Sequence, residues 1–257
     1  MNTLGIIGLI IVFFFTAVIS VVAGGTSLIT VPVMMQSGIE PHVAVATNML
    51  ALVFLSLGGT VPFIKGRSFG GGRLPWLVAL TLVGSALGAL LMVVLPSRAM
   101  PLVVSLAMLL VTAFSLANRN AGLSEDAHGA SRRMVLLGYV STLVLGIYGG
   151  FFSGGYVSLL TAAYIAFFRM TFIEAVAVTK LLNAASSLVA TAIFAREGLI
   201  DWTLGIVLGV VSFAGAALGA TFARRMSNIW LRRVFLAVVF ILALETLFYP
   251  PIAPGRP

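Results

Sequence analysis

The chain has 257 residues, of which 60% are hydrophobic and only 9% are charged. A soluble domain carries roughly 25% charged residues, so this composition excludes a soluble fold and predicts an all-α polytopic membrane protein. The formal net charge of +8 comes from basic residues in short connections between apolar runs, where they set orientation in a membrane, and this argues against nucleic-acid binding. With no cysteine and two histidines, we expect no disulfide, no metal site and no cofactor.

Ten apolar segments follow one another along the chain. The first series covers residues 3–23, 26–37, 43–64, 74–95 and 99–117, and the second covers residues 134–150, 155–168, 171–195, 203–223 and 231–249. The short members, 26–37 and 155–168, rise only ~18–21 Å against a hydrocarbon core of ~30 Å. We therefore expect eight to ten transmembrane segments, depending on whether the short ones cross.

The second series repeats the first. Gly24-Gly25 corresponds to Gly154-Gly155 at an offset of 130 residues, and Ala46-Thr47-Asn48 corresponds to Val178-Thr179-Lys180 at an offset of 132. A period of this size indicates one structural unit used twice within a single transmembrane domain. The predicted organisation is repeat one at residues 3–117, a cytoplasmic connection at 118–133 and repeat two at 134–249.

The positions of lysine and arginine distinguish two arrangements of the short segments. If these segments turn back, the two halves are parallel, Arg98 and Arg196 lie on opposite sides, and fourteen basic residues divide eight to six. If they cross, the second half is inverted, Arg98 and Arg196 share a side, and the division is eleven to three. The positive-inside rule favours the second count. We predict inverted-topology repeats in a bacterial inner membrane, with both termini outside.

Lys180 is the only lysine or arginine deep inside an apolar segment. A cation at that depth is unfavourable by ~3 kcal/mol, so it usually serves a partner, an ion or a substrate. The alternatives are a structural lysine paired with Glu174 or with carbonyl groups, or one whose ammonium reaches the interface. The first half has Asn48 at the corresponding position, so only one copy carries the charge.

Two further features of the duplicated unit point to a binding site. Each short segment follows a glycine pair, and broken helices at corresponding positions of two halves indicate a transporter site, where free N–H groups bind an anion. Neutral polar residues lie beside them in both halves, and the alternative role for these is hydrogen bonding between helices. The predicted substrate-binding residues are Lys180, Thr179, Asn183, Thr47, Asn48, Gly24, Gly25, Thr26, Ser27, Ser153, Gly154 and Gly155.

The remaining motifs have simpler interpretations. The GxxxG spacings at Gly84/Gly88 and Gly215/Gly219 predict helix-packing faces. Glu40 and His42 precede the third segment and are candidates for proton coupling. The sequence has no paired core carboxylates, no Ser/His/Asp set, no HExxH motif and no phosphate-binding loop, so we do not expect an enzyme.

Over roughly residues 5–249 the chain resembles the TauE/SafE sulfite exporter family, also called the toluene sulfonate uptake permeases. The resemblance rests on Gly24-Gly25-Thr26-Ser27 with Pro32, Ala46-Thr47-Asn48 followed by Gly58-Gly59, Gly149 to Gly155, and Val178-Thr179-Lys180. It implies a secondary transporter of small sulfur-containing or carboxylic anions, with sulfite, sulfoacetate and other organosulfonates as the usual substrates. Asn48 in place of a second lysine puts a symmetric two-cation site in doubt.

The function predicted from the sequence is export of a small anion by alternating access, with the substrate at the interface of the two repeats and coupled protons as one source of energy. The alternatives are a membrane assembly or sensor protein, in which Lys180 is structural, and an anion channel. The substrate, the transport direction and the oligomeric state, including a homodimer, are left open by the sequence.

Overall fold

The protein is helical throughout the part of the chain that the structure describes. This computed structural model describes residues 3–64, 71–100, 102–104, 106 and 131–225. Most of the predicted segment 99–117, most of the connection 118–133 and the whole segment 231–249 lie outside these residues. The helices are α1 (Thr3–Ala23), α2 (Ser27–Gln36), α3 (Pro41–Ile64), α4 (Leu74–Val94), α6 (Arg132–Phe151), α7 (Tyr156–Phe168), α8 (Phe172–Arg196) and α9 (Trp202–Arg225), with a short 3-10 turn at Gly71–Arg73.

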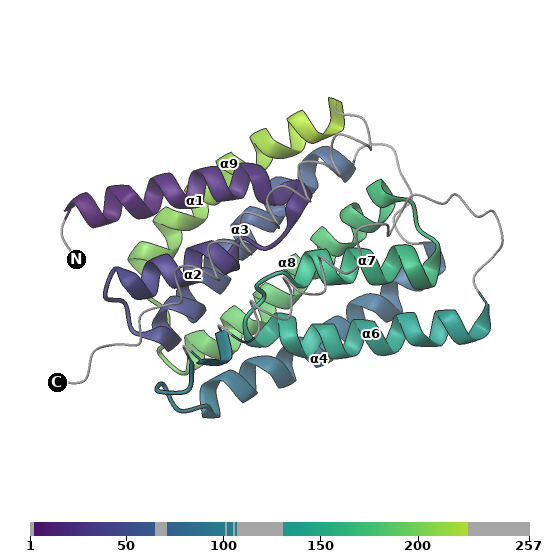
Figure 1. The fold of residues 1–257 in the computed structure, drawn as a ribbon, viewed down its shortest axis with the longest axis horizontal. Coiled ribbons are helices and arrows are strands. Elements are labelled where there is room, and N and C mark those ends of the chain that lie inside the picture. The colour runs from purple at the N-terminus through teal and green to yellow at the C-terminus, as the bar shows by residue number, and fades with distance from the viewer. Residues whose placement is uncertain (1–2, 65–70, 101, 105, 107–130, 226–257) are drawn as a thin grey trace.

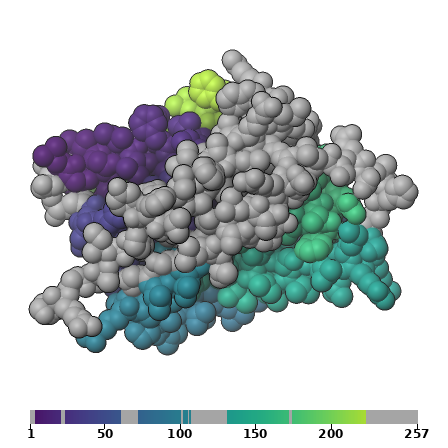
Figure 2. All heavy atoms as spheres, viewed as in Figure 1, coloured from purple at the N-terminus to yellow at the C-terminus, as the bar shows by residue number. Residues whose placement is uncertain are grey.

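Five of the described helices, α3, α4, α6, α8 and α9, are long and apolar enough to span a membrane. Shorter apolar segments lie in α1, α2 and α7. The outer faces of α1, α4, α6 and α9 expose large apolar side chains. Contact of so much apolar surface with water is unfavourable, whereas contact with the hydrocarbon of a bilayer is not. In the space-filling view, α1 forms the upper left edge and α4 and α6 form the lower edge (Figure 2). The prediction of an all-α, polytopic membrane protein is confirmed.

The short helices are the return arms of two hairpins (Figure 1). α1 enters from the left of Figure 1 and α2 returns to that end, whereas α6 enters from the right and α7 returns there. The turns use backbone angles that L-residues rarely adopt, with φ of +64° at Gly24, +85° at Gly25, +64° at Ser153 and +75° at Gly155. At ~15 Å for α2 and ~20 Å for α7, neither short helix traverses the hydrocarbon core by itself. Each hairpin returns to the end at which it began, which gives the same sidedness as two full crossings.

The second break lies later in the sequence than the first glycine pair of its motif. Gly149 and Gly150 belong to α6, which continues to Phe151. A Cβ at Gly150 would collide with the backbone of Ser85 on α4, so this glycine permits close packing of the two helices. Of the four glycines in the motif, only Gly154 and Gly155 belong to the break itself.

Helix contacts come in corresponding pairs. α1 packs on α9 of the other half, α4 packs on α6 of the other half, and α3 and α8 pack on one another at the centre. A duplicated unit would give this pattern, because exchanging the two halves converts one contact into the other. The repeats themselves stay a prediction.

Three connections meet at one end of the molecule. Glu40 from the α2–α3 connection, Ser97 beyond α4 and Glu197 from the α8–α9 connection line one pocket. If the two halves were parallel, residues 96–98 and 196–201 would lie on opposite sides of the membrane. Their meeting in one pocket therefore favours inverted halves, the arrangement that the distribution of lysine and arginine also favours.

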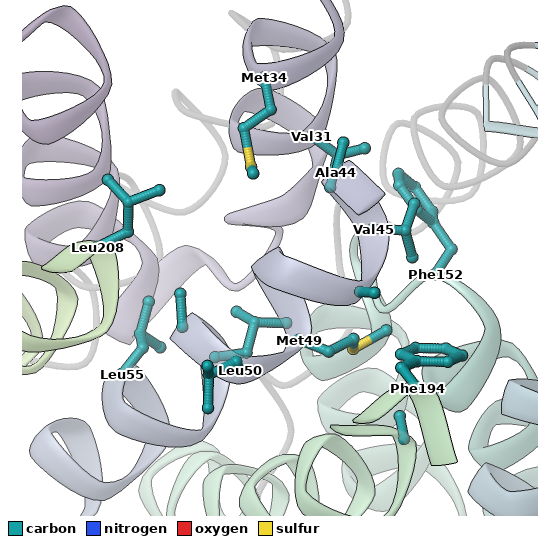
Figure 3. Close-up of a cluster of buried hydrophobic side chains, with 14 of the residues drawn as sticks. Val31, Met34, Ala44, Val45, Met49, Leu50, Leu55, Phe152, Phe194 and Leu208 are labelled. Carbon is teal, nitrogen blue, oxygen red and sulfur yellow. The ribbon is translucent and has the colours of Figure 1, made fainter. Parts of the chain in front are cut away.

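A hydrophobic core holds the central helices around the breaks (Figure 3). α2 contributes Val31 and Met34, and Phe152 comes from the second break. Figure 3 shows Phe194 of α8 beside Met49 of α3. These side chains are fully buried, so the polar groups described below lie in an apolar surrounding.

Candidate functional site

Lys180 lies in the middle of α8 and is only 1% exposed. Its ammonium donates a hydrogen bond of 3.0 Å to the backbone carbonyl of Ser20, a residue 160 positions away in the last turn of α1. The same carbonyl accepts the N–H of Gly24 at 2.8 Å. The charge of Lys180 therefore sits at the end of α1, beside the first helix break.

The proposed pairing of Lys180 with Glu174 does not occur. Glu174 is exposed and forms a capping box with Thr171, in which each side chain binds the backbone of the other residue at the start of α8. The Glu174 carboxylate thus stabilises the helix N-terminus. Of the alternatives for Lys180, pairing with a carbonyl group is the one observed.

The two breaks lie against each other's short helices. Gly24 contacts the first turn of α7, where a Cβ would meet Ser158 N at 3.0 Å and Val157 Cβ at 3.2 Å. Gly154 contacts Leu28 in the first turn of α2. The N-termini of α2 and α7 therefore converge, and their leading N–H groups and positive dipole ends favour an anion there.

Asn48 holds α2 against α3. Its Nδ2 donates to Ser27 Oγ at 2.8 Å, and its Oδ1 accepts from Thr30 Oγ1 at 2.7 Å. Asn48 and Ser27 thus come together as predicted site residues, but their polar groups bind one another. Thr26 is buried at the start of α2 without a side-chain cap bond.

Asn183 connects the second break to the first half. Its Oδ1 accepts from Ser153 Oγ at 3.2 Å, and its Nδ2 donates to Ser56 Oγ on α3 at 2.6 Å. All three side chains are buried. Asn183 therefore couples the position of the break to the central α3–α8 contact.

The two predicted threonines point in different directions. Thr179 Oγ1 lies 3.0 Å from Thr161 Oγ1 on α7 and ties α8 to that short helix. Thr47 Oγ1 accepts the N–H of Asp201 at 3.0 Å, at the start of α9. Thr47 thus binds the start of α9, away from the short helices, and its bond positions α9.

Several polar residues of this region were not predicted from the sequence. Ser20 acts through its carbonyl, which no side-chain pattern reveals. Ser187 Oγ and Thr191 Oγ1 on α8 are buried and have no hydrogen-bond partner within the described residues. Leaving such a hydroxyl unsatisfied is unfavourable by ~1–3 kcal/mol. Spacing along α8 could have identified Ser187 and Thr191, because both fall on the Lys180 face. Ser56, Thr30 and Thr161 were also missed.

The pocket between the α2–α3 connection, the end of α4 and the α8–α9 connection has a volume of about 420 Å³ and is lined by polar and apolar side chains. His42 connects its walls: Nε2 lies 2.9 Å from the carbonyl of Leu95, and Nδ1 lies 3.1 Å from Glu40 Oε1 and 3.0 Å from Ser97 Oγ. Burial by itself would raise the pKa of Glu40. Hydrogen bonds from Val43 N–H, His42 and Ser97 outweigh burial and hold that pKa below its usual value.

The comparisons with known proteins agree with a membrane transporter. The "Probable membrane transporter protein YfcA" of Escherichia coli is 28% identical over 243 residues, which cover 92% of this chain and 89% of that protein. A "Probable membrane transporter protein" of Haemophilus influenzae is 27% identical over 235 residues, 91% of either chain. No solved structure matches this chain. The family model described as "Sulfite exporter TauE/SafE" matches residues 9–246. The chain therefore belongs to the sulfite exporter TauE/SafE family, as its match over residues 9–246 and these relatives, both named probable membrane transporter proteins, show.

Proposed function

We propose that this transporter moves small oxyanions, such as sulfite or organosulfonates, through a site at Lys180. The observation that carries the proposal is a fully buried ammonium whose one partner among the described residues is a backbone carbonyl. An ammonium has three N–H donors, so one bond leaves two for another acceptor. An anionic substrate supplies both the missing acceptors and the missing negative charge.

The surroundings of Lys180 suit an anion with several oxygens. The converging starts of α2 and α7 offer N–H groups, and the glycines at Gly24-Gly25 and Gly154-Gly155 let the two breaks pack closely enough to bring these starts together. Thr26 and Ser27 add hydroxyl donors in this proposal. Ser153 already donates its hydroxyl hydrogen to Asn183, so it positions the second break, while Asn183, Asn48 and Thr179 position the short helices. Thr47 has a positioning role at α9.

Alternating access would come from one half moving against the other. The hairpins enter from opposite ends and meet at the site, so a relative shift opens the site to one end while closing it to the other (Figure 1). The interior side of a bacterial inner membrane is electrically negative, so outward movement of an anion gains ~2.3 kcal/mol per charge per 100 mV. Coupling to protons through Glu40 and His42 is a second hypothesis for the driving force.

The test is uptake of labelled sulfite, sulfoacetate and a carboxylate by liposomes carrying the purified protein. We expect saturable flux in wild type and a loss of roughly tenfold or more in Lys180→Ala, because a removed charge contact is worth at least ~1.4 kcal/mol. Lys180→Arg is expected to impair flux as well, since a planar guanidinium does not fit a site shaped for an ammonium. Arg196→Ala removes the same charge at the exposed end of α8 and should leave the flux unchanged.

The alternatives predict different results. Full flux in both Lys180 variants would show that Lys180 is structural and would overturn the site. Flux that does not saturate would identify a channel. Folded protein that moves none of these anions would favour an assembly or sensor protein.

A further inference from the structure

α8 carries a line of three buried polar side chains that leads away from the proposed site. Ser187 and Thr191 follow Lys180 by seven and eleven residues. At 100° per residue these spacings bring all three within about 20° of one line along the helix, and they put Ser187 ~10 Å and Thr191 ~16 Å from Lys180 along the axis.

Unpartnered hydroxyl groups distinguish this line from its neighbours on the same helix. Ser187 is 1% exposed and Thr191 is 6% exposed, and neither hydroxyl has a hydrogen-bond partner in the described part of the chain. Ser186, the adjacent residue, lies 2.9 Å from Ser85 Oγ on α4, and Asn183 uses both ends of its amide. Buried hydroxyl groups normally form hydrogen bonds. Two buried hydroxyls one turn apart without a partner therefore indicate an acceptor that binds there only transiently.

The pocket lies beyond the end of α8 toward which this line runs. α8 ends at Arg196, and Glu197 and Leu199, which follow directly, line the pocket of about 420 Å³. Glu197 is six residues beyond Thr191, or ~9 Å at helical rise. Carboxylates at Glu40 and Glu197 repel an anion, so the pocket is suited to its release.

We propose that Ser187 and Thr191 form a transit site for the oxyanion between Lys180 and this pocket. The inference rests on the function proposed above and adds the path that the anion takes from Lys180 to the pocket. Each hydroxyl can donate to an anionic oxygen without adding a fixed charge, so the anion is held weakly enough to move on. The corresponding residues of the first half are Leu55 and Gly59, at the offset of 132 that pairs Asn48 with Lys180, so only the half with the lysine has this line.

The test uses the absence of cysteine from the chain. Ser187→Cys and Thr191→Cys replace a hydroxyl by a thiol of similar size in a background with no other thiol. The probe is a sulfonate-bearing, membrane-impermeant methanethiosulfonate reagent, applied to reconstituted protein from the side of the pocket. We expect both thiols to react roughly tenfold or more faster than Ser186→Cys and Ala190→Cys, because reaction requires the thiolate, which forms where water reaches. Sulfoacetate, which does not react with the reagent, should slow the reaction.

Flux measurements complete the test. Ser187→Ala and Thr191→Val should lower the maximal flux several-fold and leave the half-saturating concentration near that of wild type, whereas Ser186→Ala should change neither.

Thiols at 187 and 191 that react no faster than the one at 190 would overturn the transit site, even where flux through Lys180 is intact. Reactive thiols that sulfoacetate protects, together with flux that Lys180→Ala leaves unchanged, would support the route while the Lys180 site fails. If Thr191→Cys does not fold, Ser187→Cys against Ser186→Cys decides alone.

Discussion

At the scale of the residue, glycine decides how closely the helices of the two halves approach. A Cβ on Gly88 would collide with the carbonyl of Ile147 on α6, and one on Gly219 would collide with the carbonyl of Val18 on α1. Backbone atoms cannot rotate away as a flexible side chain can. The prediction that both GxxxG spacings are packing faces is confirmed, and the two faces serve corresponding contacts, α4 on α6 and α9 on α1.

We expect Gly88→Ala to destabilise the protein by at least ~1–3 kcal/mol, since the methyl group would overpack a backbone contact. The measurement is the thermal unfolding midpoint in detergent. Gly8→Ala is the matched control, because Gly8 also lies in a helix but has no atom within 4 Å of its added Cβ. An equal midpoint for both variants would show that α4 and α6 separate easily.

At the scale of the element, the short helices depend on polar ties to their long neighbours. An isolated helix below ~12–15 residues is marginal, and α2 has only 10 residues. Asn48 binds α2 at Ser27 and Thr30, and Thr179 binds α7 at Thr161. Thr47 shows that adjacent residues of one motif can serve different elements, because its hydroxyl binds the start of α9.

We expect Asn48→Ala to weaken α2 and to lower the free energy of unfolding by ~0.6–2 kcal/mol per lost bond. Hydrogen exchange should rise in α2 more than in α3, since α3 keeps its full length of backbone bonds. Ser37→Ala serves as the control, because the Ser37 hydroxyl binds the Val33 carbonyl at the exposed end of α2. Unchanged exchange in α2 would mean that apolar packing alone holds it.

At the scale of the whole molecule, the two hairpins give the fold its two ends. The N-terminal hairpin opens to the end that carries the pocket, and the α6–α7 hairpin opens to the other (Figure 1). The 24 residues of α3 connect the ends, and a rise of ~36 Å is enough to cross a bilayer. Finding which end of α3 faces the outside of the cell therefore determines the orientation of the whole protein in the membrane.

We expect Ser37→Cys to react with a membrane-impermeant thiol reagent from outside intact cells and Gly72→Cys to react only after the membrane is opened. Ser37 and Gly72 are exposed at opposite ends of α3, and a Cβ at Gly72 meets no atom within 4 Å. The unmodified chain, which has no cysteine, gives the background. The reverse pattern would contradict the orientation that the basic residues predict.

The sequence by itself determined the class of the protein, the places where helices break and the residue that carries a charge into the core. These features are local: hydropathy reflects the solvent around each segment, glycine permits a positive φ wherever it stands, and Lys180 lies in an apolar run whatever surrounds it. The glycine spacings also indicated packing faces, because a GxxxG repeat forms a flat surface on a single helix.

Only the tertiary structure decided which polar groups meet. The Lys180 ammonium binds the carbonyl of Ser20, Asn183 joins Ser153 to Ser56, and Gly24 faces the first turn of α7. Apart from the Asn183–Ser153 bond, these contacts join the two halves of the chain, and a hydrogen bond depends on positions within tenths of an ångström. The order of residues along a helix fixes the face on which a side chain lies, whereas its partner is fixed by how the helices pack.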